Sequence, residues 1–204
     1  MKPAPKFSLL QHAVKLIFLY LLMVRLLSLN VRGLLSDHKQ LVLSHYLRQH
    51  STHIACLQET NLTDRVTHNR LSDYDMFLNP ATHVSNGTAI FLHLSLLTSW
   101  TVHDHVILVP GYLQVLSLSC HTQTMLIINV YGPQAEPDGI NVIRNLEGFL
   151  NHSPYTPHII VCADFNCTTD SIDRKNCVES KLQLAAALQN LCSDYNLVDI
   201  WRSF

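Results

Sequence analysis

The chain has 204 residues, of which 48% are hydrophobic and 14% are charged, and its formal net charge is -1. This length suits one domain with a full core, and the apolar bias excludes a disordered chain. The near-neutral charge argues against a module that binds nucleic acid tightly, although it is compatible with an enzyme that contacts nucleic acid through a metal.

The amino-terminal segment contains an apolar run over residues 16–24. This run is shorter than the ~20 apolar residues of a membrane-spanning helix. It has the length of a signal-peptide core, but no small-residue cleavage site follows it. We predict that residues 1–24 form an apolar extension and that residues 25–204 form the domain. A nuclear or cytoplasmic location is expected, with secretion or anchoring through residues 16–24 as the alternative.

Short apolar runs then alternate with helical patterns, which is typical of an α/β fold. Strands are predicted over residues 25–30, 53–58, 87–92, 112–119, 125–131 and 158–164. Helices are predicted over residues 37–49, 139–151 and 178–195. The first helix has Ser36 as its expected N-cap, and we expect one face of it to carry Leu41, Val42, His45 and Tyr46.

Cysteine and histidine spacing gives little support for a zinc site. None of the six cysteines are spaced as Cys-x-x-Cys. Cys56, Cys120 and Cys162 lie in apolar runs, which predicts buried, reduced thiols and a reducing compartment. His103-Asp104-His105 could clip a metal from one face of an extended segment, but no third ligand stands nearby, and a polar loop between strands is the simpler interpretation.

Four predicted strands end in polar residues. The first ends at Asn30, Glu59 follows the second, the fifth ends at Tyr131, and the sixth ends at Asp164 with Asn166 two residues later. Loops at the carboxyl ends of such strands form a crevice in α/β enzymes. Each residue also has an ordinary explanation as a cap, a turn or a core aromatic. Their shared position at strand ends favours a chemical site.

These side chains suit phosphate chemistry with a bound Mg²⁺ ion, which prefers oxygen ligands. Glu59 is the natural metal ligand, and Asn30 can add an amide oxygen or hold a metal-bound water. Asp164 can orient or deprotonate the attacking water. Asn166 and Tyr131 can hydrogen-bond the phosphate.

Several motifs resemble those of the exonuclease–endonuclease–phosphatase superfamily. They are Ser28-Leu-Asn-Val-Arg-Gly-Leu34, Cys56-Leu-Gln-Glu-Thr60, Ile128-Asn-Val-Tyr-Gly-Pro133 and Ala163-Asp-Phe-Asn-Cys167. The best match is the apurinic-endonuclease-like domain of non-LTR (LINE-type) retrotransposons, which Asp173-Arg174 and Val198-Asp-Ile-Trp-Arg202 also fit. The resemblance covers residues 25–204.

This resemblance implies a two-sheet α/β sandwich with outer helices (DNase I-like) that cleaves phosphodiester bonds of nucleic acid with Mg²⁺ or Mn²⁺. Asn30 and Glu59 would serve the metal, and Asp164 would position the nucleophile. Tyr131 and Asn166 would contact the phosphate or its water, and Arg174 would add a substrate contact. The expected partner is nucleic acid, DNA in the first instance, bound weakly.

The chain departs from the family pattern in two places. Ala163 stands where the family commonly has Gly. Family members also continue into strands that carry a Ser/Asp motif and a terminal Asp-His pair, which do not occur before Phe204. We therefore expect a domain that lacks its last strands and is weakly active or inactive, because losing one transition-state donor can cost ~10²–10³ in rate.

Two other interpretations stay open. The chain could be a catalytically inactive, retrotransposon-derived remnant. Alternatively, it could keep the fold and act as a phosphatase or phosphodiesterase on a substrate other than nucleic acid. The lack of a basic sequence footprint is compatible with that second alternative.

Overall fold

The computed structural model describes residues 17–19, 24–63, 71–82, 86–121, 123–152, 158–168 and 181–200. One sheet has the strand order β1 (Ile17–Leu19), β2 (Val24–Asn30), β3 (Ile54–Gln58), β5 (Thr88–His93), β4 (Tyr74–Asn79). The second has the order β6 (Thr101–Val109), β7 (Leu113–Cys120), β8 (Gln123–Tyr131), β9 (His158–Asp164). The helices are α1 (Asp37–Gln49), α2 (Glu136–Asn151) and α3 (Leu182–Asp194), with a short 3-10 turn, η2 (Leu96–Thr98).

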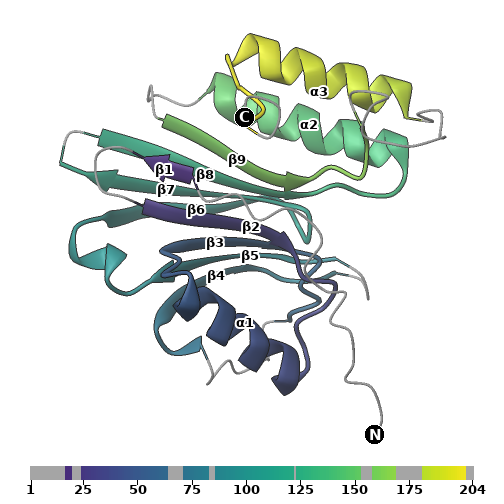
Figure 1. Ribbon diagram of the computed structural model, residues 1–204. Helices are drawn as coiled ribbons and strands as arrows, with labels where there is room; N and C mark the ends of the chain where they lie inside the picture. Colours follow the sequence, from purple (N-terminus) through teal and green to yellow (C-terminus); the bar gives the residue numbers. More distant parts are fainter. Residues whose placement is uncertain are drawn as a thin grey trace, which may run out of the picture.

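The two sheets stack face to face, with helices on the outside (Figure 1). Helix α1 packs on the five-stranded sheet, and α2 and α3 pack on the four-stranded sheet. The pairs β2–β3 and β8–β9 are parallel, whereas the other strand pairs described are antiparallel. This arrangement confirms the predicted two-sheet α/β sandwich with outer helices.

The six strands predicted from apolar runs are all present, with bounds that shift by two residues at most. Strands β1, β4 and β6 were not predicted, and each of them lies at the edge of its sheet. An edge strand is covered on fewer sides than a central one, so its sequence does not need a continuous apolar run. Strand β1 belongs to the predicted amino-terminal extension, most of which lies outside the described residues. Within the described ranges, no helix combines the length and apolar character needed to cross a bilayer.

The segment His103-Asp104-His105 lies in β6, so the loop predicted there is wrong. A register shift between Val102 and Asp104 interrupts its pairing with β7. The His103 ring contacts the Ser119 hydroxyl at 2.6 Å, whereas the His105 ring contacts the Gln114 side chain at 2.8 Å. The two imidazoles therefore serve separate partners and do not form the metal clip that their spacing allowed.

Helix α1 confirms its predicted cap and corrects its predicted face. The Ser36 hydroxyl accepts a hydrogen bond from the backbone N–H of Lys39, as an N-cap does. Leu41 and Val42 are 50% and 41% exposed, so the predicted apolar face is wrong. The buried residues are Gln40, Leu43, Ser44 and Leu47, which follow the i, i+3, i+4, i+7 spacing of one helical stripe.

Helix α2 begins at Glu136, three residues before its predicted start, because Pro137 suits the first turn of a helix. The carboxylate of Glu136 also caps the neighbouring helix. Its Oε1 atom accepts hydrogen bonds from the backbone N–H groups of Gln183, at 2.9 Å, and Leu184, at 3.1 Å. These N–H groups at the start of α3 have no partner within their own helix, and the negative charge also suits the helix dipole.

Replacing Glu136 by Ala is therefore expected to lower the free energy of unfolding by about 0.5–2 kcal/mol, the usual effect of losing a helix cap. Urea unfolding followed by circular dichroism measures the change. Asp138→Ala is the matched control, because Asp138 is an exposed carboxylate in the same first turn of α2. Equal effects of the two substitutions would show that Glu136 acts only through the charge of α2 and does not cap α3.

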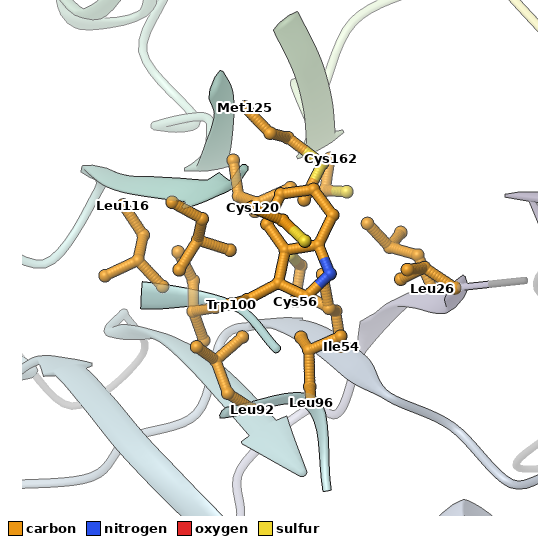
Figure 2. Close-up of a cluster of buried hydrophobic side chains, with 14 residues drawn as sticks. Leu26, Ile54, Cys56, Leu92, Leu96, Trp100, Leu116, Cys120, Met125 and Cys162 are labelled. Atoms are coloured by element: carbon orange, nitrogen blue, oxygen red, sulfur yellow. The ribbon is translucent and has the colours of Figure 1, made fainter. Parts of the chain in front are cut away.

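The space between the sheets holds an apolar cluster around Trp100 (Figure 2). Cys56, Cys120 and Cys162 belong to this cluster and are buried and free, as the sequence predicted. Burial raises the pKa of the Cys56 thiol well above its usual value, which keeps it protonated and unreactive.

Alternate residues of each strand face this space, and they change from apolar to polar toward the carboxyl ends of the parallel pairs. The apolar ones are Val24 and Leu26 in β2, Ile54 and Cys56 in β3, Met125 and Ile127 in β8, and Cys162 in β9. The polar ones that continue the same spacing are Ser28 and Asn30, Gln58, Asn129 and Tyr131, and Asp164. The space between the sheets thus becomes polar at the carboxyl ends of these strands.

Candidate active site

The polar end of the sandwich brings together the residues predicted from the strand ends. Asn30 is the last residue of β2, and Glu59 directly follows β3. Tyr131 and Asp164 are the last residues of β8 and β9 and are paired in register. The arrows of β2 and β9 point to the same side of the molecule (Figure 1). Both parallel pairs therefore deliver their carboxyl ends to one site.

The Asn30 amide joins two carboxylates that come from different sheets. Its Nδ2 atom donates to Asp164 Oδ2 at 2.8 Å and to Glu59 Oε2 at 3.2 Å. Its Oδ1 atom accepts the backbone N–H of Arg32 at 3.0 Å, which fixes the orientation of the amide. In this arrangement Asn30 holds the two carboxylates side by side, and its oxygen is engaged by the backbone.

Tyr131 completes the contacts of Glu59. Its hydroxyl donates to Glu59 Oε2 at 3.4 Å, and its ring stacks on Tyr112 with 6.3 Å between the centroids. Burial raises the pKa of Tyr131 above its ordinary value, the charges of Glu59 and Asp164 add to this, and the Asn166 amide partly opposes it. The phenol therefore stays protonated at neutral pH and remains a hydrogen-bond donor.

Asn166 is held by hydrogen bonds to the end of β9 and to the residue that follows β8. Its backbone N–H donates to Asp164 Oδ1 at 3.1 Å, and its Nδ2 donates to the Gly132 carbonyl at 2.7 Å. Its φ of 51° is left-handed, a conformation that Asn tolerates better than most residues. Gly132 is needed for this approach, because a Cβ there would lie 2.4 Å from the Phe165 carbonyl oxygen.

The backbone of Glu59 adopts a costly conformation that its neighbours maintain. Its φ is 54°, and a left-handed conformation costs an L-residue roughly 1–2 kcal/mol. The Glu59 carbonyl accepts from Gly33 N–H at 2.6 Å, and the flanking residue Thr60 accepts from Leu34 N–H at 2.7 Å. Strained residues whose conformation is held by several surrounding hydrogen bonds cluster at functional sites.

Buried amides behind the site were not assigned a role from the sequence. Gln58 Nε2 donates to Asn129 Oδ1 at 2.8 Å, across the two sheets. Asn129 Nδ2 donates in turn to the carbonyls of Leu57, at 3.0 Å, and Ala89, at 2.9 Å. Gln58 and Asn129 stand immediately before Glu59 and two residues before Tyr131. A polar residue within an apolar run was the signal that could have identified them.

Lys181 is a further residue that the sequence did not indicate. Its Nζ donates to the backbone carbonyl of Asn166 at 2.7 Å and places a cation beside this loop. The predicted contact Arg174 lies outside the described residues, as do Asp173 and the Trp201-Arg202 pair. Ala163, which replaces the usual Gly, lies in β9 opposite Val130 with extended backbone, so the strand accommodates it.

The donor set fits a hard divalent cation better than zinc. Glu59 and Asp164 supply carboxylate oxygens, and Mg²⁺ is usually held by one or two carboxylates together with waters and substrate phosphate. Within the ranges that the structure covers, no group of three or more His, Cys, Asp or Glu side chains could form a metal cage. Among the histidines described, none has a hydrogen bond to the five predicted site residues that the structure describes.

Comparison with known proteins identifies the family of the chain. A family model for the endonuclease/exonuclease/phosphatase family matches residues 27–201. The uncharacterized 149 kDa protein of transposon TX1 from Xenopus laevis is 25% identical over 177 residues, which cover 86% of this chain and 13% of that protein. An exodeoxyribonuclease from Bacillus subtilis is 26% identical over 164 residues, covering 75% of this chain and 62% of the enzyme.

The fold is shared with solved structures of low sequence identity. An AP endonuclease from Archaeoglobus fulgidus superposes with a TM-score of 0.60 at 16% identity, covering 78% of this chain and 68% of that one. The chain spans less than two thirds of the length of both sequence relatives.

Proposed function

Because the chain belongs to the endonuclease/exonuclease/phosphatase family, we propose that it is a nuclease that hydrolyses phosphodiester bonds with a divalent cation, Mg²⁺ or Mn²⁺. The observation that carries the proposal is the Asn30 amide, which holds the Glu59 and Asp164 carboxylates together at the ends of two sheets. A structural cap or turn does not require two carboxylates from different sheets to meet.

The proposed mechanism divides the work among the strand-end residues. A bound cation would lower the pKa of a water and neutralise charge on the phosphate. Glu59 would hold that cation, and Asp164 would orient the attacking water and accept its proton. The phenol of Tyr131 and the amide of Asn166 donate hydrogen bonds to phosphate oxygens as negative charge develops on them. Asn30 holds both carboxylates side by side through its amide, and Lys181 adds positive charge beside the Asn166 loop.

The proposed substrate is nucleic acid, with DNA expected first. The two sequence relatives are a transposon protein and an exodeoxyribonuclease, which supports nucleic acid over other phosphate esters. The net charge of -1 fits weak binding that depends on the cation. A nuclear or cytoplasmic location is part of the same proposal, and cell fractionation tests it.

Nicking of supercoiled plasmid with Mg²⁺ or Mn²⁺ tests this function. We expect slow nicking that chelator abolishes. The described residues of the site supply carboxylates and hydrogen-bond donors to the phosphate, but none of them is a histidine. The expectation of a weakly active or inactive chain stays a prediction until this is measured. A folded chain that cleaves an inositol phosphate or a simple phosphate ester but not DNA would support the alternative substrate, and one that cleaves none of them would support the inactive remnant.

A further inference from the structure

A second set of polar side chains lies at the other end of the sandwich. His53 directly precedes β3, whereas Glu59 directly follows it. His93 ends β5, which runs antiparallel to β3 and pairs Leu92 with Ile54. The five residues of β3 span roughly 17 Å at the usual rise of a strand, so this set is distinct from the candidate active site.

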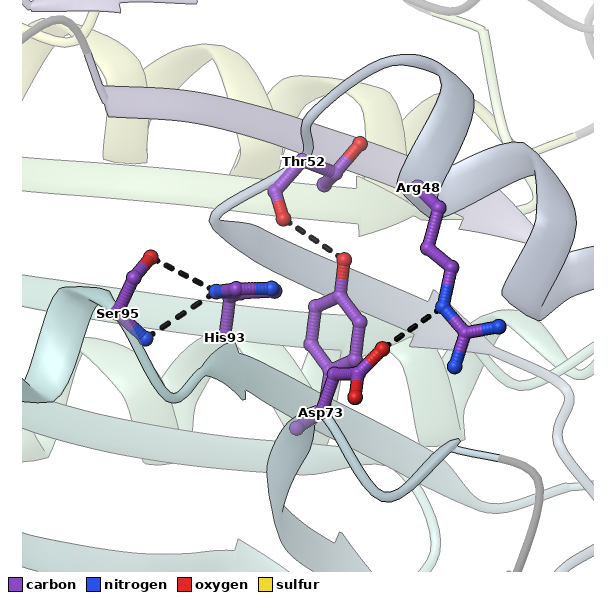
Figure 3. Close-up of polar contacts among 6 residues, drawn as sticks. Arg48, Thr52, Asp73, His93 and Ser95 are labelled. Carbon is purple, nitrogen blue, oxygen red and sulfur yellow. Dashed lines mark hydrogen bonds and ion pairs between the residues drawn. The ribbon is translucent and has the colours of Figure 1, made fainter.

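These side chains line two adjoining cavities. The larger has a volume of about 270 Å³, and its lining includes Arg48, Ser51, Thr52, His53, His93 and Ser95. The smaller has a volume of about 120 Å³, shares His53 and Ser95, and adds Ser99. Figure 3 shows His93 with Ser95, and Arg48 with Asp73, around this end of the sheet. No Asp or Glu lines either cavity within the described part of the chain.

The backbone fixes which nitrogen of each histidine carries the proton. His53 Nδ1 accepts the backbone N–H of Arg25 at 3.0 Å, and His93 Nδ1 accepts the backbone N–H of Ser95 at 3.1 Å. A ring nitrogen that accepts an N–H is unprotonated, so this geometry places a proton on Nε2 of each ring. Burial lowers the pKa of His53, and the neighbouring His93 and Arg25 lower it further, which keeps this ring neutral at pH 7.

The fixed tautomers favour an anion over a metal ion. A metal would need the Nε2 lone pairs, and the two histidines could offer them only by moving their protons to Nδ1 and losing the backbone hydrogen bonds. An oxyanion instead accepts a hydrogen bond from Nε2–H without any change of tautomer. Arg25 and Arg48 add positive charge here, although Asp73 pairs with Arg48 Nε at 2.7 Å.

We propose that this cavity binds a phosphate-type oxyanion between His53 and His93. The two Nε2–H groups donate to the anion, and Ser51, Thr52 and Ser99, which also line the cavities, carry hydroxyls that can act as further donors. The Ser95 hydroxyl is not one of these free donors, because it lies 2.7 Å from His93 Nδ1 and donates to it when that nitrogen is unprotonated. The Arg48 guanidinium has N–H groups beyond the one that Asp73 engages. Inorganic phosphate, a phosphate monoester and a nucleic-acid phosphate share this chemistry.

Nitrogen-detected or long-range ¹H–¹⁵N spectra of the histidine rings test the proposal with the full chain in chelator. We expect inorganic phosphate to shift the His53 and His93 Nε2 resonances saturably, with a Kd of about 1 mM or tighter, while Nδ1 stays unprotonated. Methyl phosphate and a short oligonucleotide are titrated in parallel. Shifts with the oligonucleotide would identify a strand phosphate as the source, and shifts with the small anions alone would identify a free phosphate or monoester.

The matched variants are His53→Asn and His93→Asn, because an Asn side chain can still accept the backbone N–H that reaches Nδ1. We expect each to weaken phosphate binding at least about tenfold, a loss of about 1.4 kcal/mol. His103→Asn, at an exposed position of β6, should leave binding unchanged. The proposal is overturned if phosphate gives no saturable shift, if either variant binds phosphate as tightly as the unmodified chain when judged by its remaining histidine, or if Zn²⁺, added in a separate titration without chelator, moves the proton to Nδ1 and binds in preference to phosphate.

Discussion

Replacing Glu59 by Gln is expected to reduce metal-dependent nicking by about 10²-fold or more, the scale seen when one group that stabilises the transition state is lost. Gln keeps the size of Glu and can still accept the Tyr131 hydroxyl, which contacts Oε2 at 3.4 Å. The substitution therefore removes charge while it preserves the local packing. A hard cation loses a carboxylate ligand that a neutral amide replaces poorly.

Binding of Mn²⁺ gives a measurement that does not depend on turnover. We expect the unmodified chain to bind Mn²⁺ at least about tenfold more tightly than Glu59→Gln, as judged by the electron paramagnetic resonance of the free ion. Glu147→Gln is the control, since Glu147 lies in α2 outside the described site. Equal Mn²⁺ affinities for the Glu59 and Glu147 variants would remove Glu59 from the metal site, whatever the activity of the chain.

Replacing Asn129 by Leu is expected to lower the free energy of unfolding by about 3–5 kcal/mol, at the upper end for single substitutions. Asn129 is fully buried and satisfies Gln58 and two backbone carbonyls in the opposite sheet. Leu is similar in size but leaves these groups without a partner in a dry interior. Urea unfolding measures the loss, and Asn145→Leu on the exposed face of α2 should change stability by no more than about 0.5 kcal/mol.

A double-mutant cycle separates the hydrogen bonds from the packing. The combined change Gln58→Leu with Asn129→Leu should cost less than the sum of the single changes, because it removes both members of one buried pair. Strictly additive losses would mean that the bond of 2.8 Å between the two side chains contributes little. Residual nicking of the Asn129 variant, measured well below its unfolding midpoint, would show how far this pair aligns Glu59 with Tyr131.

The central strands were predictable because their burial on both faces demands continuous apolar sequence. The same physics explains why β4 and β6 were not found, since an edge strand tolerates polar residues on its open side. The face of α1 was mispredicted from Leu41 and Val42 because apolar residues also occur at the surface of folded proteins. Hydrophobicity along one helix does not reveal which side the sheet will cover.

The positions of the site residues were predictable, whereas most of their partners were not. Asn30, Glu59, Tyr131 and Asp164 mark the points where buried strands end, and a single strand's pattern is enough to locate them. The contact between Gln58 and Asn129 joins residues 71 positions apart and depends on the stacking of two sheets. Lys181 contacts the carbonyl of Asn166 across 15 positions of the chain, a separation that no local pattern encodes.

The bond between Asn30 and Asp164 spans 134 positions of the chain, and this separation bears on the order in which the protein folds. Contacts of such long range form slowly, after local helices and hairpins, because the intervening chain must first be ordered. The candidate active site therefore assembles only when the two sheets have docked. If the proposed cation binds there, it binds the native state alone and stabilises it by mass action, so the proposed activity and completed folding would arise in the same step.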